Sequence, residues 1–356
     1  MKHLSVKKLM LTGSFIFAGM GLVSAWGVWG HQHINRAAVF ALPSPMRSFF
    51  YNHIDFITEE SVVPDLRKYS INDKAEFPRH FINLESYLPG TGDGASAAQV
   101  LAHLPLTLQE VKERYADTFL TKAGILPWYI EEVEEKLTKA FREGRKTEIL
   151  FLAADLGHYI GDAHMPLHTA LNHDGLLTGQ KGIHAFWEGQ LPEMFGPGYH
   201  LYTGAARYIP DIGMETRAMI DSTYGLAEKV LALDRELSSS MPKERVYLMD
   251  PDSAGKIVVN QFKDPVHSRE YAVKYHARLK GMIEGQLRAA IAETASYWYT
   301  AWVNAGRPDL SAMDPRELTE RNKVFLIRDD RLWREGRVDM VNPGGEFTPF
   351  MGRLKQ

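Results

Sequence analysis

Apolar residues recur at helical spacing over long stretches of this sequence, and this periodicity limits the fold more than any other feature. The stretch from residue 268 to 305 carries apolar residues four apart at Leu279, Ile283, Leu287 and Ile291. This spacing places them on one face of a long amphipathic helix. Comparable patterns predict helices over 127–143, 148–164 and 215–237. Because alternating strand patterns are nearly absent before residue 310, the sequence predicts an all-α fold, a single multi-helix bundle.

Composition narrows the classes of partner. The 356 residues include 41 Lys and Arg against 44 Asp and Glu, a formal net charge of −3. A protein with this balance does not attract nucleic acid by bulk charge, so phosphate chemistry would need a local positive charge such as a bound metal. The chain has no cysteine, so stability must come from the core and from metal. We expect no stable protein partner.

The amino terminus has the pattern of a secretory signal peptide. Residues 1–25 join a basic start to a mostly apolar run over 9–23 and small side chains at Ser24 and Ala25. Cleavage after Ala25 would make Trp26 the first residue, leave no integral membrane span, and deliver the protein to a periplasm or the exterior. The alternative is a retained anchor, although the apolar run is short for a span. We expect the main domain over 26–308 and an extension over 309–356, in which 324–327 is the only strand-like run.

Histidines cluster with carboxylates at the spacing of metal ligands. His158 and Asp162 are four apart in a predicted helix, and His184 and Glu188 repeat that spacing. Two such side chains project from the same helix face and can bind one ion. Further candidates lie nearby in the sequence: His31, Asp65, His80 and His168. One turn before His158, Asp155 is a candidate hydrogen-bond partner for it.

These residues stand in motifs that resemble those of the zinc-dependent phospholipase C and S1/P1 nuclease superfamily. The motifs are Trp26-Gly-Val-Trp-Gly-His31, Asp65 followed by His80-Phe81, the segment from His158 to His168, and His184-Ala-Phe-Trp-Glu188. The resemblance covers roughly 26–305 and implies a helical bundle of that type. It also implies three Zn²⁺ ions per chain.

Carried over to this sequence, the family pattern assigns nine ligands. The resemblance implies one zinc on Asp65, His80, His158 and Asp162. It implies a second on His168, His184 and Glu188, with room for water or substrate. It implies a third on the amine and carbonyl of Trp26, on His31, and on the other oxygen of Asp162. A water bridging two zincs would then attack the phosphodiester, with Asp65 orienting it or accepting its proton.

Two branches of the superfamily remain open for the substrate. Phe81 stands where nucleases stack an aromatic on a base, Asn83 stands where they bond the base, and Lys68 replaces their arginine. Glu188 and the short gap from His168 to His184 instead match the phospholipases. Trp29 and Leu66 replace the carboxylate and the aromatic of a choline pocket.

We therefore expect a phosphodiesterase of single-stranded nucleic acid or nucleotides. The alternatives are a phospholipase C acting on phospholipid, another phosphoester substrate, or a silent helical binding protein that keeps zinc for stability. The complete, open ligand set argues against the last of these.

Overall fold

The structure of the chain, a computed structural model, describes residues 27–87, 97–253, 255–260, 262–314, 318 and 320–338. The predicted signal peptide, its cleavage point and Trp26 lie outside these residues. Within the described ranges, no helix combines the length and the apolar character needed to cross a membrane.

The described residues form helices and no strand, which confirms the all-α prediction. The first half of the chain contains α1 (Gly27–Ala41), α2 (Ser44–Asn52), α3 (Ile54–Glu60), α4 (Val63–Tyr69), η1 (Phe77–His80), η2 (Leu84–Tyr87), α5 (Ala97–His103), α6 (Leu108–Arg114), α7 (Asp117–Ala123), α8 (Leu126–Arg142) and α9 (Lys146–Ala163). The second half contains η3 (Pro166–Thr169), η4 (Leu176–Thr178), α10 (Ile183–Ala185), η5 (Phe186–Gln190), α11 (Leu191–Phe195), η6 (Gly196–Gly198), α12 (Ile212–Ser239), α13 (Lys243–Val246), α14 (Arg269–Leu279), α15 (Met282–Asn304), η7 (Leu310–Ala312) and α16 (Glu320–Arg334).

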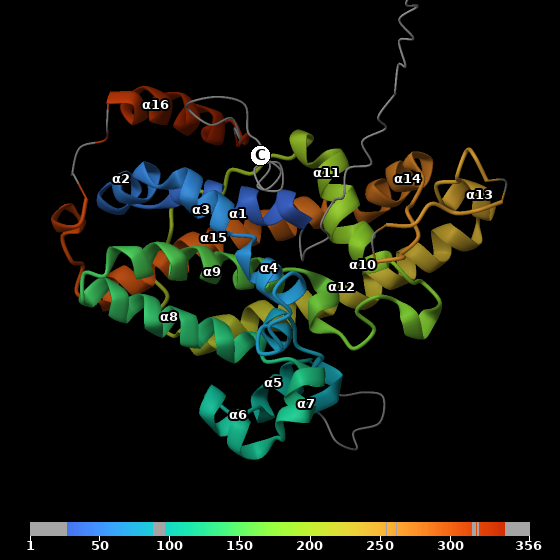
Figure 1. Ribbon diagram of the computed structural model, residues 1–356, viewed down its shortest axis with the longest axis horizontal. Coiled ribbons are helices and arrows are strands. Elements are labelled where there is room, and N and C mark those ends of the chain that lie inside the picture. The colour runs from blue at the N-terminus through green and yellow to red at the C-terminus, as the bar shows by residue number, and fades with distance from the viewer. Residues whose placement is uncertain are drawn as a thin grey trace, which may run out of the picture.

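Helix α9 lies at the centre of the bundle, where it packs against α1, α3, α8 and α15 (Figure 1). Buried aromatic side chains join these helices. The Trp298 ring of α15 stacks on Phe50 of α2 with ring centroids 5.0 Å apart, and its indole N–H donates to the Ala153 carbonyl of α9 at 2.9 Å. Burying side chains of this size supplies much of the energy that holds a helical core together.

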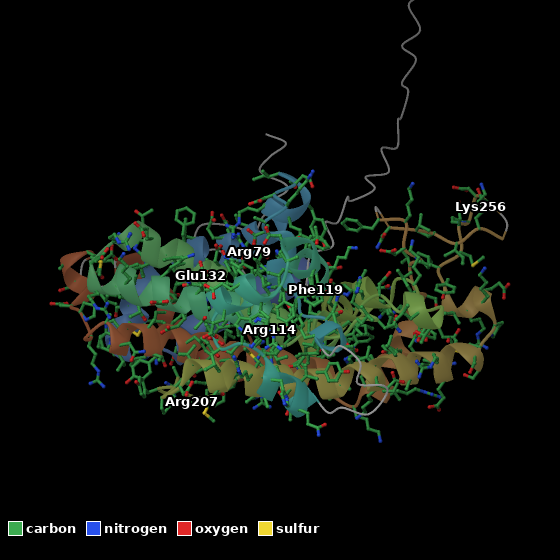
Figure 2. The ribbon with its side chains drawn as sticks, turned by 90° about the horizontal axis from the view of Figure 1, so that it is seen from below. Arg79, Arg114, Phe119, Glu132, Arg207 and Lys256 are labelled. Carbon is green, nitrogen blue, oxygen red and sulfur yellow. The ribbon has the colours of Figure 1, made fainter. Side chains whose placement is uncertain are left out.

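Two smaller parts extend from the bundle. Helices α5, α6 and α7 form a group below the main bundle in Figure 1, packed against α12, α8 and η1. The segment 247–267, between α13 and α14, doubles back on itself through three isolated antiparallel bridges: Tyr247 to His267, Met249 to Ile257, and Val259 to Pro265. Lys256 of this segment lies at one end of the molecule in Figure 2.

Three of the four predicted long helices are confirmed as α8, α9 and α12. The single helix expected over 268–305 is wrong, because Lys280 and Gly281 adopt left-handed conformations and separate α14 from α15. The strand-like run at 324–327 is also wrong, since these residues lie within α16. Glu134 of α8 is buried and accepts a hydrogen bond from Thr138 at 3.0 Å.

The carboxyl-terminal helix α16 packs on α1 and α2 (Figure 1). Its Trp333 is buried between Phe40 of α1 and Tyr202. The Tyr51 hydroxyl of α2 donates to the Asp329 carboxylate of α16 at 2.8 Å. These contacts attach α16 to the face of α1 and α2.

Candidate metal centre

Close approach of α1 to α9 builds the deepest part of the site. A Cβ atom on Gly157 would lie 1.9 Å from Asn35 Oδ1, and one on Gly161 would lie 3.1 Å from His31 Nδ1. A side chain at Gly157 would overlap Asn35, and one at Gly161 would crowd His31. As a result the His31 ring of α1 stacks on the His158 ring of α9, with centroids 3.9 Å apart.

The first group of ligand atoms lies where α4, η1 and α9 meet. His80 Nδ1 lies 2.9 Å from Asp162 Oδ2 and 3.7 Å from Asp65 Oδ1. His158 Nε2 lies 3.3 Å from the same Asp162 oxygen and 3.1 Å from His80 Nδ1. Two ligands of a tetrahedral zinc, each about 2.0–2.1 Å from the ion, lie about 3.3 Å apart. The structure therefore brings Asp65, His80, His158 and Asp162 together at ligand spacing.

The second group joins η3, α10 and η5. His168 Nε2 lies 3.2 Å from His184 Nε2 and 3.4 Å from Glu188 Oε2, and His184 Nε2 lies 3.1 Å from Glu188 Oε1. The other ring nitrogens of both histidines contact backbone carbonyls, His168 that of His80 and His184 that of His173. Two ring nitrogens that face each other at this distance repel unless a proton or a cation lies between them.

Asp162 lies between the groups. Its Oδ1 atom is 3.6 Å from His31 Nε2 and 3.6 Å from His168 Nδ1, whereas its Oδ2 faces His80 and His158. His31 thus stands on the side of Asp162 predicted for the third ion. Trp26, the remaining predicted ligand of that ion, lies outside the described residues.

Several atoms of the candidate ligands are buried without a hydrogen-bond partner in the described part of the chain: both ring nitrogens of His31, both oxygens of Asp65 and Oδ1 of Asp162. Buried polar atoms are normally paired, so a concentration of unpaired ones in one place indicates a missing ligand. Three sets, of which the first two share His158, have donor atoms mutually within 4.8 Å: His31, Asp65 and His158; His80, His158 and Asp162; His168, His184 and Glu188. These buried clusters could hold metal ions.

The electrostatics of the site favour positive charge among the carboxylates. Burial would lower the pKa of His158, but Asp162 and Asp65 outweigh it and raise this pKa to about 9. Burial would also lower the pKa of His184, but the Glu188 carboxylate outweighs it and raises this pKa to about 9. Burial also opposes ionisation of Glu188, yet His184 and His168 lower its pKa to about 2. A metal ion would supply the same compensation and displace these protons.

A cleft of about 570 Å³ opens directly over the second group. His168, His184 and Glu188 contribute to its lining, whereas the residues of the first group lie beneath it. The Lys68 ammonium lies 4.6 Å from the centre of the Tyr69 ring and 5.5 Å from that of Phe77, on the same wall. Desolvation would lower the pKa of Lys68, but Tyr69 and Asp65 raise it on balance, so this side chain is a fixed cation.

Phe81 and Asn83 also line the cleft. The Phe81 ring is half-buried and makes an edge contact with Phe77, with centroids 5.4 Å apart. The buried Asn83 amide donates to the Lys122 carbonyl at 2.8 Å, and its Oδ1 atom has no hydrogen-bond partner among the described residues. The cleft wall therefore offers an aromatic face, with a fixed but buried acceptor beside it.

One predicted supporting contact is wrong. Asp155 does not bond His158; its carboxylate accepts from Arg67 Nη2 at 2.7 Å, and the His158 Nδ1–H donates to the Ser61 carbonyl at 2.7 Å. The sequence analysis missed Glu76, a fully buried carboxylate whose Oε1 lies 3.6 Å from His80 Nε2. Its position four residues before His80 is the signal that could have identified it.

No protein-family model matches this chain, and no curated protein matches it.

Proposed function

We propose that this protein is an exported zinc-dependent phosphodiester hydrolase of the S1/P1 nuclease type, acting on single-stranded nucleic acid or nucleotides. The observation that carries the proposal is the convergence of seven buried His, Asp and Glu side chains and the half-buried His184 at the floor of an open cleft. Imidazole and carboxylate donors at tetrahedral spacing suit zinc, and the clusters contain no thiolate that would select a softer metal.

The division of roles follows from which groups the cleft reaches. When bound, zinc would activate a water molecule and stabilise the charge that develops on the leaving oxygen. His168, His184 and Glu188 line the cleft, so the scissile phosphate would bind on their side. The Asp65 carboxylate, whose oxygens have no hydrogen-bond partner among the described residues, would accept a proton or a hydrogen bond from a metal-activated water. The ammonium of Lys68 neutralises a phosphate oxygen from the cleft wall.

Phe81 and Asn83 would hold the base. The face of the Phe81 ring stacks on it, a contact worth about 1–3 kcal/mol. The bond from the Asn83 NH₂ group to the Lys122 carbonyl fixes the orientation of the amide, so the Oδ1 acceptor would meet a ring N–H or amino group on the base edge.

Turnover by the metal-loaded and the chelated protein tests the proposal. Zinc-loaded protein beginning at Trp26 is assayed on single-stranded DNA, RNA, a 3′-nucleotide and phosphatidylcholine vesicles. We expect hydrolysis of the nucleic acids that chelation abolishes and zinc restores. His168→Asn should abolish it, whereas His103→Asn, on the exposed surface of α5, should not. Hydrolysis that survives chelation would contradict the proposal.

A phospholipase C remains the second candidate because four exposed apolar side chains line the cleft. They are Tyr69, Phe77, Leu171 and Phe262. Exposed apolar patches beside a site favour an apolar surface such as a lipid bilayer. Faster turnover of phosphatidylcholine than of every nucleic acid would favour this candidate.

A non-catalytic protein stabilised by zinc is the remaining candidate. Structural zinc sites tend to be closed by four protein ligands, whereas the second group offers three and faces the cleft. Zinc binding without turnover of any phosphoester would favour this candidate.

The free α-amine of Trp26 is one of the proposed zinc ligands. An α-amine coordinates zinc only when it is free, so a protein carrying a residue before Trp26 should bind one zinc fewer and lose most of its activity. Full zinc content in such a tagged protein would remove Trp26 from the ligand set.

A further inference from the structure

His80 presents a different ring nitrogen to the metal centre from His158 and His184. Those two place Nε2 among the carboxylates, with Nδ1 on a backbone carbonyl behind the ring. His80 instead places Nδ1 at 2.9 Å from Asp162 Oδ2, so its Nε2 points away from the centre. The group behind that nitrogen decides which tautomer of His80 exists.

Glu76 lies behind His80. It is fully buried and stands four residues earlier, with its Oε1 atom 3.6 Å from His80 Nε2. The hydroxyl of Tyr159 donates to the same Oε1 atom. On the other oxygen, Oε2 accepts from Arg67 Nε at 3.0 Å and from Arg79 Nη1 at 2.9 Å. The carboxylate is therefore fixed in position by three donors.

The charges around Glu76 keep it ionised. Arg67 also donates to Asp155, so two guanidinium groups face two carboxylates outside the metal centre. Arg79 is held in turn over the Tyr129 ring of α8, 4.4 Å from its centre (Figure 2 shows Arg79). Because this set is electrically balanced by itself, Glu76 remains an anionic hydrogen-bond acceptor whether or not the metal centre is charged.

We propose that Glu76 is a positioning residue for the metal centre: it accepts the Nε2–H of His80 and so leaves the Nδ1 lone pair of His80 directed at the ion. The inference rests on the proposed zinc site. An anionic acceptor behind a metal-bound imidazole fixes its tautomer and orientation and raises its basicity more than a carbonyl does. His80 is thereby the strongest neutral donor of the first group.

Cobalt binding tests this assignment without any substrate. Apoprotein is titrated with Co²⁺ against a competing chelator, and the visible absorption of the bound ion is recorded. We expect Glu76→Gln to weaken the tightest sites by about 10 to 100-fold and to change the absorption spectrum. Glu134→Gln, which also neutralises a buried carboxylate but outside the centre, should bind Co²⁺ as the wild type does.

Other outcomes separate the two proposals. Unchanged affinity and spectrum in folded Glu76→Gln would overturn the role of Glu76, whereas wild-type protein that binds no Co²⁺ would overturn the metal site itself.

A second measurement uses unmodified protein, in case Glu76→Gln does not fold. Nitrogen-15 NMR of the zinc-loaded wild type should show His80, assigned by the loss of its signals in His80→Asn, with a protonated Nε2 and a zinc-bound Nδ1. The opposite tautomer would overturn the inference.

Discussion

Asp162 is the residue on which the candidate centre depends most, because its two oxygens face different histidines. Oδ2 lies beside His80 and His158, and Oδ1 faces His31 and His168. Glu188 faces only the second group. We therefore expect Asp162→Asn to lower the metal content by more than one ion and activity by more than about 100-fold, and Glu188→Gln to cost less in both. Elemental analysis and turnover measure this. Equal losses in the two variants would contradict a bridging Asp162.

A substitution at Phe81 can distinguish binding of a base from chemistry at the phosphate. Removing its ring by Phe81→Ala should raise KM for single-stranded nucleic acid by about 5 to 150-fold, the equivalent of about 1–3 kcal/mol of stacking. Hydrolysis of a base-free phosphodiester should hardly change. Phe151→Ala, exposed on α9, is the matched control. Parallel losses on both substrates would mean that Phe81 only packs the cleft wall.

Glu134 gives the stability of the fold a predictable pH dependence. Burial raises its pKa from 4.5 to about 7. Folding therefore opposes its ionisation, so Glu134 reduces stability as pH rises from about 4.5 to 7, and the cost is complete above that. Glu134→Gln should stabilise the protein by about 1–3 kcal/mol at pH 8 and by almost nothing at pH 4. Chemical denaturation at both values measures the difference. An equal gain at both would exclude an ionised Glu134 as the cause.

At the scale of elements, the turn between α14 and α15 depends on one backbone conformation. Gly281 has φ of +79°, Gly285 is helical, and a Cβ added to either meets no atom within 4 Å. The two positions therefore differ only in their backbone conformation, since both have room for a side chain. Gly281→Ala should destabilise the fold by about 1 kcal/mol, and Gly285→Ala should stabilise it by about 0.5–1 kcal/mol. Thermal unfolding of the two variants decides this, and effects of the same sign would show that φ is not the determinant.

Helical periodicity predicted α8, α9 and α12 because their apolar faces are long and continuous. The same signal failed at 280, since α14 and α15 both bury apolar residues and only the left-handed Lys280 and Gly281 reveal the break. The signal was also misleading at 324–327, because a run of four apolar residues is too short to distinguish a strand from part of a helix. Their helix α16 extends from Glu320 to Arg334 through charged residues that the strand interpretation ignored.

The metal-centre residues could be predicted in sequence order, but their supporting contacts could not. Spacing of four indicated that His158 and Asp162, or His184 and Glu188, share a face. It could not show that a salt bridge to Arg67 directs Asp155 away from His158. Nor could it show that Glu76 lies behind His80, because that contact depends on the packing of η1 against α9. The fixed acceptor on Asn83 depends likewise on the carbonyl of Lys122, 39 residues away.

At the scale of the whole molecule, the buried ring of Trp333 is the main apolar contact between α16 and the bundle. Trp333 is 3% exposed, whereas Ile327 on the same helix is 76% exposed. Trp333→Ala should cost about 3 kcal/mol of stability, because it leaves a cavity between Phe40 and Tyr202. Ile327→Ala should stay within about 0.5 kcal/mol. Denaturant unfolding tests both, and a small effect of Trp333→Ala would mean that α16 detaches before the bundle unfolds.

The wide separation of the candidate ligands along the chain has a consequence for the order of folding. They come from α1, α4, η1, α9, η3, α10 and η5, so the centre exists only after segments from residue 31 to residue 188 have met. Contacts of such high sequence separation close large loops and form late on a folding pathway. Metal would therefore not nucleate folding. It would act after the transition state, by slowing the unfolding rate, and give the metal-loaded protein kinetic stability in place of faster folding.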